Sequence, residues 1–273
     1  MVGVSPSFFF SSFSTDFSVD DYKKGLENLK NLGFSSYQGE IFYENKLKEW
    51  ENQASELLEV SQNLNISMSA FVSHFLIHYF ETSQSLFSDD GYTQFQRVCS
   101  IVKKFENVNT LILPIGSFTS TGDFPTIEKA FFNRIKRYCE IAENFNLQIA
   151  LEILPHSLVG GVDGFLRLIE KIEIDNLGYN FDTGHANCSG EILSLIPQKL
   201  KGKIYSTHLK DNFGEKNLSL PPGRGSIDWK LLLKALKESG YNGTFDLEIN
   251  SNQKNVDNDY SEGLNYLKSL GYK

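Results

Sequence analysis

Residues 148–248 contain four short runs that each end in a polar side chain: QIALE at 148–152, LGYNFD at 177–182, KIYSTH at 203–208 and TFDLE at 244–248. The runs are rich in β-branched or aromatic residues, which is typical of β-strands. Their last residues are Glu152, Asp182, His208 and Glu248. In an α/β barrel, this is the position from which a parallel strand delivers a side chain to the active-site rim. The four runs therefore predict both a fold and a site.

The spacing between these strand ends argues against a local motif. They are 30, 26 and 40 residues apart, and each separation is long enough for one strand, one crossover helix and two loops. The same alternation of amphipathic helix, polar turn and short strand runs through the chain. DYKKGLENLKNLGF leads into SSYQGEIF, and DWKLLLKALKESGYNG leads into TFDLEI, with Gly33 and Gly240 expected to end the two helices.

This alternation yields eight strands and eight helices. We expect strands near residues 2–9, 35–41, 66–72, 110–115, 148–154, 177–182, 204–208 and 244–249. We expect helices near residues 20–32, 46–64, 89–105, 125–145, 161–172, 189–196, 228–239 and 257–270. No linker or low-complexity segment divides the 273 residues, and a (β/α)8 barrel needs roughly 250. The prediction is one α/β domain over residues 1–273, a single (β/α)8 TIM barrel.

The composition indicates which binding partners and which cellular location are expected for this protein. A formal net charge of −8 and a pI near 5.2 disfavour nucleic acid, because phosphate backbones attract clustered Lys and Arg. The chain has no run of about 18 apolar residues, which predicts no membrane span, and MVGVSPSFFFSSF lacks the basic start of a secretory signal. Three cysteines without a CxxC pair favour a reducing, cytoplasmic location. Association into a homo-oligomer is left open.

Three carboxylates and one imidazole that converge on one barrel rim are suitable donors for a divalent metal. Each alone would more often be a helix cap or a solvated charge, but four on successive strands favour a shared ligand. The oxygen-rich set suits Mn²⁺ best, with Mg²⁺, Co²⁺ or Zn²⁺ as alternatives. We expect one ion per chain, held by Glu152, Asp182, His208 and Glu248.

Other residues near the predicted strand ends are candidates for contact with a substrate. His185 follows Asp182 by three residues in FDTGHAN, where Gly184 is expected to permit a sharp turn. Arg224 stands between two glycines in PPGRGSIDW, within residues 209–227, the longest irregular stretch. The remaining candidates are Glu40 and His74, at the ends of the second and third strands.

For several polar residues the sequence leaves the role open. Lys210 and Asp211, in THLKDN, either project into the site or form a solvent-exposed ion pair. His78 follows His74 at helical spacing, but no Glu follows His74 as in HExxH, so a structural role for His78 is favoured over zinc binding. The role of His156, just beyond the fifth strand, is open in the same way.

These motifs resemble the xylose isomerase-like TIM-barrel superfamily, the sugar phosphate isomerase/epimerase family. The resemblance covers most of the chain and rests on ALEI, NFDTGHAN, THLKDN, PPGRGSIDW and GYNGTFDLEI, in the family's order. It implies that Glu152 and Glu248 bind the metal and act as the acid/base pair. It also implies that Asp182 and His208 only ligate the metal and that His185 contacts substrate. Epimerases of this family usually carry an Arg shortly after the ligand His, where this chain has DNFGEKN.

The expected function is a divalent-metal-dependent isomerase or epimerase of a small sugar or polyol, acting by proton abstraction through an enediolate. Loss of a β-hydroxyl from the same enediolate would give dehydration, so a dehydratase of the inosose or dehydroshikimate type is the alternative on the same scaffold. An endonuclease IV-like DNA repair enzyme is disfavoured, since ILPIGS and DNFGEKNLSL lack the histidines of its three-metal cluster. The intact ligand set disfavours a noncatalytic sugar-binding barrel.

Overall fold

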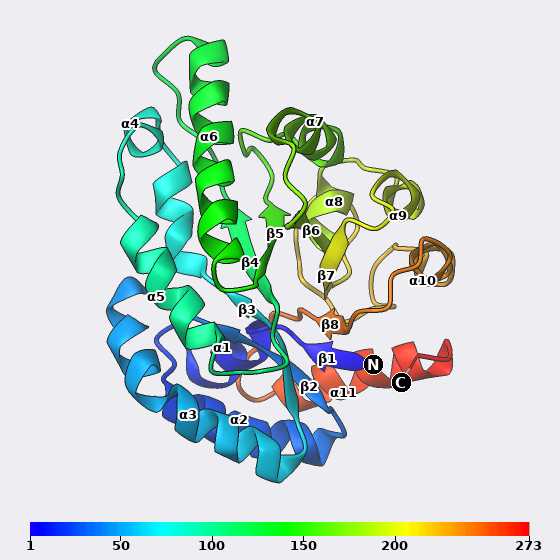
Figure 1. Ribbon diagram of the computed structural model, residues 1–273. Coiled ribbons are helices and arrows are strands. Elements are labelled where there is room, and N and C mark those ends of the chain that lie inside the picture. The colour runs from blue at the N-terminus through cyan, green and yellow to red at the C-terminus, as the bar shows by residue number, and fades with distance from the viewer. Residues whose placement is uncertain (273) are drawn as a thin grey trace.

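Figure 1 shows strands surrounded by helices in the computed structural model, which describes residues 1–272. Within that range, parallel strands close into a barrel in chain order, and β1 pairs with β8 to complete it. The strands are β1 (Val2–Val4), β2 (Ser36–Glu40), β3 (Ser67–Val72), β4 (Thr110–Ile115), β5 (Gln148–Ile153), β6 (Leu177–Asp182), β7 (Ile204–Leu209) and β8 (Phe245–Leu247). The predicted (β/α)8 barrel is confirmed.

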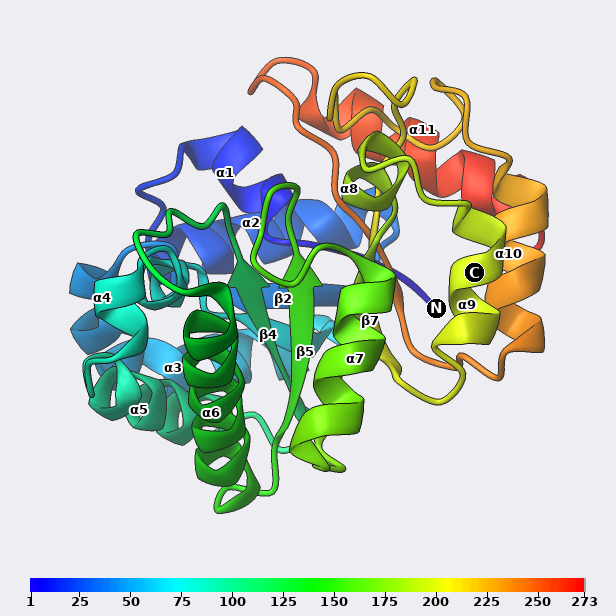
Figure 2. The ribbon, with the colours of Figure 1, turned by 90° about the horizontal axis from the view of Figure 1, so that it is seen from above.

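Helices connect the strands and cover the outside of the barrel. The longer ones are α2 (Val19–Leu32), α3 (Leu47–Leu64), α5 (Tyr92–Val102), α6 (Phe124–Glu143), α7 (Val162–Ile172), α10 (Trp229–Glu238) and α11 (Val256–Ser269). The short segments are α1 (Ser7–Phe13), η1 (Glu44–Lys46), η2 (His74–Phe80), α4 (Ser83–Leu86), α8 (Thr183–Cys188), η3 (Leu193–Leu195) and α9 (Ile196–Lys199). In Figure 2, the arrowheads of β4 and β5 point toward the end of the barrel where α1 and α8 lie. No helix within residues 1–272 has the length and apolar character needed to cross a membrane.

The first predicted strand is wrong beyond Val4, because Ser7–Phe13 form helix α1. Pro6 precedes this helix with a φ of −58°, a helical value, and its nitrogen cannot donate to a strand ladder. The aromatic residues that suggested a strand are instead buried by packing against α2. The ring centroids of Phe9 and Tyr22 are 3.9 Å apart.

The helix predicted near residues 189–196 is also wrong, because the helix after β6 is α8, which lies earlier in the chain, at Thr183–Cys188. Helix α8 begins directly after β6, because the Oδ1 atom of Asp182 accepts a hydrogen bond from the His185 N–H at 2.8 Å and caps the helix. Helix α8 ends at Cys188, and the chain that follows forms only the short segments η3 and α9. The same Asp182 carboxylate therefore caps a helix through one oxygen and leaves Oδ2 to the barrel rim.

The interior of the barrel contains buried polar side chains beneath its rim. A large apolar cluster fills the space between strands and helices, whereas a small separate cluster contains Ala70, Val72, Ile112 and Ala150. Side chains two residues apart on a strand face the same way. Buried polar residues therefore lie one layer below the rim: Gln38, Asn180, Ser206 and Asp246.

Candidate metal centre

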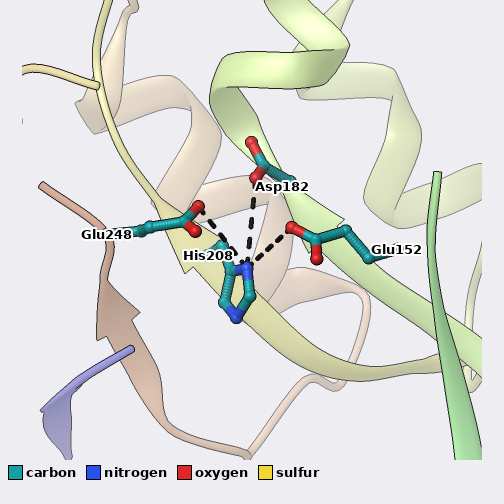
Figure 3. Close-up of side chains that lie close together, drawn as sticks. All are labelled: Glu152, Asp182, His208 and Glu248. Atoms are coloured by element: carbon teal, nitrogen blue, oxygen red, sulfur yellow. Dashed lines mark hydrogen bonds and ion pairs between the residues drawn. The ribbon is translucent and has the colours of Figure 1, made fainter. Parts of the chain in front are cut away.

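The carboxyl end of the barrel brings Glu152, Asp182, His208 and Glu248 together. Each residue offers one ligand atom, and these four atoms lie within 4.8 Å of one another. The Nδ1 atom of His208 is 2.8 Å from Glu152 Oε1, 3.5 Å from Glu248 Oε2 and 4.0 Å from Asp182 Oδ2. Figure 3 shows the three carboxylates arranged around this nitrogen. The structure thus brings together all four residues predicted to bind metal.

Burial and charge shift the pKa values of these groups. Burial lowers the pKa of His208, but the charges of Glu248 and Glu152 outweigh it and raise the pKa to about 10. Burial raises the pKa of Glu248 to about 7, against the opposing charges of Lys210 and His208. Burial favours a raised pKa for Asp182, but nearby cationic groups hold it below its usual range. The site therefore concentrates negative charge that protons, Lys210 or a metal ion must balance.

The donor set fits a divalent cation. The Oδ2 atom of Asp182 is buried and receives no hydrogen bond of regular geometry, although Lys210 Nζ lies 2.8 Å away. Buried oxygens usually have such a partner, so this atom needs a positive charge beside it, which Lys210 supplies here and a divalent cation could also supply. Three carboxylates and one imidazole are mostly hard donors, which suit Mn²⁺, Mg²⁺ or Co²⁺ and are compatible with Zn²⁺.

Lys210 and Asp211 are both buried, so the alternative of a solvent-exposed ion pair is wrong. Lys210 Nζ lies 2.7 Å from Glu248 Oε2 and 3.4 Å from His185 Nε2. Burial lowers the pKa of Lys210, but the surrounding carboxylates outweigh burial and raise it. Asp211 instead accepts a hydrogen bond from Trp229 Nε1 at 2.8 Å. Lys210 therefore belongs to the site, whereas Asp211 fastens the long loop to α10.

Three further candidates line a cavity of about 100 Å³ beside the metal donors: Glu40, His74 and His185. His74 Nδ1 is 3.5 Å from Glu40 Oε1, and the His74 ring stacks on Phe42 with centroids 4.2 Å apart. His185 Nε2 is 3.5 Å from Asp182 Oδ2, and burial lowers the pKa of His185. Much of the remaining lining is apolar: Pro6, Phe10, Phe42, Val72, Pro114 and Leu154. The cavity therefore combines a charged side with an apolar side.

The structure does not bring Arg224 to this cavity. Its guanidinium pairs with Asp259 at 2.9 Å and with Glu262 at 2.5 Å, both on α11. The loop after β7 is thereby fastened to that helix. The sharp turn expected at Gly184 is also wrong, because Gly184 lies within helix α8. A glycine is needed there because the Lys210 side chain passes directly against it.

The two remaining histidines lie outside the cavity. His78 Nδ1 is 3.0 Å from Glu81 Oε2, and the His78 side chain is mostly exposed. His156 has a φ of 66° in the loop after β5, and it lines a different cavity together with Cys188 and Glu191. Neither histidine belongs to the lining of the cavity beside the metal donors.

Two buried polar residues below the rim, Gln38 and Asp246, were not predicted from the sequence. Gln38 Oε1 is 2.8 Å from His208 Nε2, and Gln38 Nε2 is 2.9 Å from Asp246 Oδ2. Burial raises the pKa of Asp246 to about 6. Strand alternation was the available signal, because Asp246 faces the same side as Glu248, and Gln38 the same side as Glu40.

The fold is a (β/α)8 barrel with four candidate metal ligands at its rim, and sequence comparison places this barrel in a family. The chain belongs to the xylose isomerase-like TIM barrel family, whose model matches residues 26–270. An inosose isomerase of Halalkalibacterium halodurans is 29% identical over 140 residues, which cover 45% of this chain and 50% of that protein. The chain spans about half the length of the curated relatives it matches.

Solved structures share the fold over nearly the whole chain. The crystal structure of an IolI protein with a bound zinc atom has a TM-score of 0.76 and 18% identity, covering 98% of this chain and 97% of that one. A D-tagatose 3-epimerase-like protein has a TM-score of 0.78 and 20% identity, covering 99% and 98%. At these identities the likeness shows the fold.

Proposed function

We propose that the protein is a divalent-metal-dependent isomerase or epimerase of a small sugar or polyol, acting by proton abstraction through an enediolate. The observation that carries the proposal is a set of four donor atoms within 4.8 Å of one another, beside a cavity of about 100 Å³. Similarity to an inosose isomerase supports the substrate class. The zinc atom bound to the IolI protein, which has the same fold, supports a bound metal in this barrel.

Glu152 and Glu248 are the proposed acid/base pair. They stand at the ends of β5 and β8, three strands apart around the barrel, so they approach a bound substrate from different sides. In the metal-free site the pKa of Glu248 is about 7, so its carboxyl can hold or release a proton at neutral pH. A bound divalent cation supplies positive charge against the negative charge that develops on substrate oxygens. Asp182 and His208 are proposed as ligands that take no part in proton transfer.

The proposed substrate contacts are His185, His74 and Glu40. His185 is partly buried beside Asp182, and its pKa is lowered, which favours a neutral imidazole that can accept a hydrogen bond from a hydroxyl or donate one to it. Glu40 and the Phe42 ring hold the His74 side chain in a fixed plane. The apolar side of the cavity suits the C–H face of a sugar. Together they would orient the substrate over the carboxylates.

The proposal is tested by incubating Mn²⁺-loaded protein in D₂O with a panel of free ketoses, sugar phosphates and inososes. The reactions are followed by NMR. We expect turnover of at least one compound, with deuterium gained at the exchanged carbon. Glu152→Gln and Glu248→Gln each keep one metal-binding oxygen and should lower turnover by about 10²- to 10⁴-fold. Glu143→Gln, an exposed change at the end of α6, is the matched control.

Metal content, measured for each variant, separates loss of the ion from loss of proton transfer. Near-normal turnover in both metal-loaded Gln variants contradicts the two-carboxylate mechanism. A product lighter than its substrate by one water would assign the dehydratase reaction to the same site instead.

A further inference from the structure

The metal-facing nitrogen of His208 is one end of a buried chain of hydrogen bonds inside the barrel. On the other side of the ring, Nε2 lies 2.8 Å from Gln38 Oε1. Gln38 Nε2 lies 2.9 Å from Asp246 Oδ2 and 3.2 Å from Ser206 Oγ. Gln38 and Asp246 are fully buried, and His208 is 2% exposed. These contacts are therefore shielded from competition with bulk water.

The amide of Gln38 gives this chain a direction. An amide oxygen only accepts hydrogen bonds and an amide nitrogen only donates them. The carboxylate of Asp246, which accepts from Thr244 Oγ1 at 2.5 Å and Ser69 Oγ at 3.4 Å, requires the nitrogen end of Gln38 to face it. Turning the amide around would set two oxygens against each other. The amide oxygen therefore faces His208, whose Nε2 must carry the proton.

We propose that Asp246 and Gln38 are positioning residues that keep a proton on His208 Nε2 and turn Nδ1 toward the metal donors. A ligating imidazole presents its lone pair to the ion, and the hydrogen bond of its other nitrogen decides which tautomer is present. The inference rests on the proposed metal-dependent function. Neither positioning residue lines the cavity, so both act through His208.

Zn²⁺ is a suitable probe because it is diamagnetic and allows the His208 Nε2–H to be followed by ¹H–¹⁵N NMR. Asp246→Asn keeps the side-chain shape but introduces a donor. Gln38 is then free to turn and present its nitrogen to His208 Nε2, which favours the other tautomer. We expect the Zn²⁺ affinity, measured by competition with a chelator, to fall about 10- to 100-fold. The Nε2–H resonance should weaken or disappear.

A double variant distinguishes the positioning role from a purely structural one, because only the positioning role predicts that Zn²⁺ affinity is recovered. In Gln38→Glu/Asp246→Asn, the new carboxylate accepts from His208 Nε2–H, and the new amide at position 246 donates to that carboxylate. We expect this variant to recover most of the Zn²⁺ affinity lost in Asp246→Asn. Ser69→Ala removes a longer contact with Asp246 and a hydrogen bond to Tyr37 O, but it leaves the contacts of Gln38 with His208 and Asp246 in place, so it should bind Zn²⁺ like the wild type.

If Asp246→Asn does not fold, Gln38→Met tests the same chain of hydrogen bonds, because it removes the acceptor for His208 Nε2–H. We expect the same loss of Zn²⁺ affinity. A folded single variant with wild-type Zn²⁺ affinity and an unchanged Nε2–H resonance overturns the inference. A folded double variant that binds Zn²⁺ no better than Asp246→Asn does so as well. These measurements follow only Zn²⁺ affinity and the His208 Nε2–H resonance. Absence of sugar turnover would therefore count against the proposed function and not against the positioning role of Gln38 and Asp246.

Discussion

Gly184 lies directly against Lys210: a Cβ atom at position 184 would stand 2.6 Å from Lys210 Cγ and 2.7 Å from Lys210 Cε. Carbon atoms in contact prefer roughly 3.5–4.0 Å, so a side chain there would displace the lysine. The missing side chain lets the Lys210 ammonium reach Asp182 Oδ2 at 2.8 Å and Glu248 Oε2 at 2.7 Å. A glycine in the first turn of α8 therefore helps to set the charge balance of the site.

Gly184→Ala should push the Lys210 side chain aside and weaken both of its ion pairs. Because the site is closely packed, we expect the free energy of unfolding of the metal-free protein to fall by about 1–3 kcal/mol. Chemical denaturation measures this difference. Gly122→Ala is the matched control, since the nearest atom to a Cβ at that position is 3.4 Å away. Equal stability of the two variants would show that Lys210 is not confined by Gly184.

Lys210→Met removes a buried ammonium and leaves Asp182 and Glu248 without it. Loss of one partner from a buried ion pair costs about 3–5 kcal/mol, so the metal-free variant should unfold at a lower temperature than the wild type. A divalent cation replaces the lost charge. The rise in melting temperature on adding Mn²⁺ should therefore be larger in the variant. Lys199→Met, which breaks an exposed pair with Asp163, should leave the Mn²⁺ response unchanged, and equal shifts in Lys210→Met and wild type would contradict this prediction.

The convergence of the four candidate ligands could be predicted because two regularities are visible in the sequence. Strand composition marks where Glu152, Asp182, His208 and Glu248 stand, and the crossover length between parallel strands places those ends on one rim. Neither regularity depends on the packing of a particular side chain. This is why seven of the eight predicted strands lie close to their observed places, while the first extends too far.

Features that depend on tertiary partners could not be predicted in the same way. Arg224 stands in a loop whose glycines suggested substrate contact, but its guanidinium forms an ion pair with Glu262 of α11. Gln38 and Asp246 carry no local motif, and their role becomes visible only when the closed barrel sets them beside His208. A pairing between side chains some 200 residues apart cannot be inferred from strand periodicity.

Arg134 is a buried cation outside the site, on α6, and it should be important for stability. Its guanidinium lies 4.9 Å from the Tyr92 ring centroid, and it donates to Ser88 O at 2.7 Å and also to Asp90 O. Arg134→Met leaves these carbonyls without their donor, which should lower the free energy of unfolding by about 1–3 kcal/mol. Urea denaturation measures the change. The exposed Arg137→Met should stay within about 0.5 kcal/mol of wild type, and a similarly small effect of Arg134→Met would count against the assigned role.

Metal binding should release a proton from His208. In the metal-free site the pKa of His208 is about 10, so its imidazole is protonated at neutral pH. Nδ1 faces the three carboxylates, and an ion must displace the proton on that nitrogen in order to bind. The proton competes with the ion below the pKa of His208, so lowering the pH weakens metal binding and raising it strengthens binding.

Between pH 8 and pH 9, Glu248, with a pKa of about 7, is mostly ionised while His208 still holds its proton. We therefore expect release of close to one proton per ion and an affinity that rises about tenfold per pH unit in this window. Calorimetric titration with Mg²⁺ in two buffers of different ionisation enthalpy counts the protons. His208→Ala should remove this proton release, whereas His78→Ala, an exposed change beside Glu81, should retain it. Binding without proton release in the wild-type protein would mean that the ion does not take the Nδ1 position.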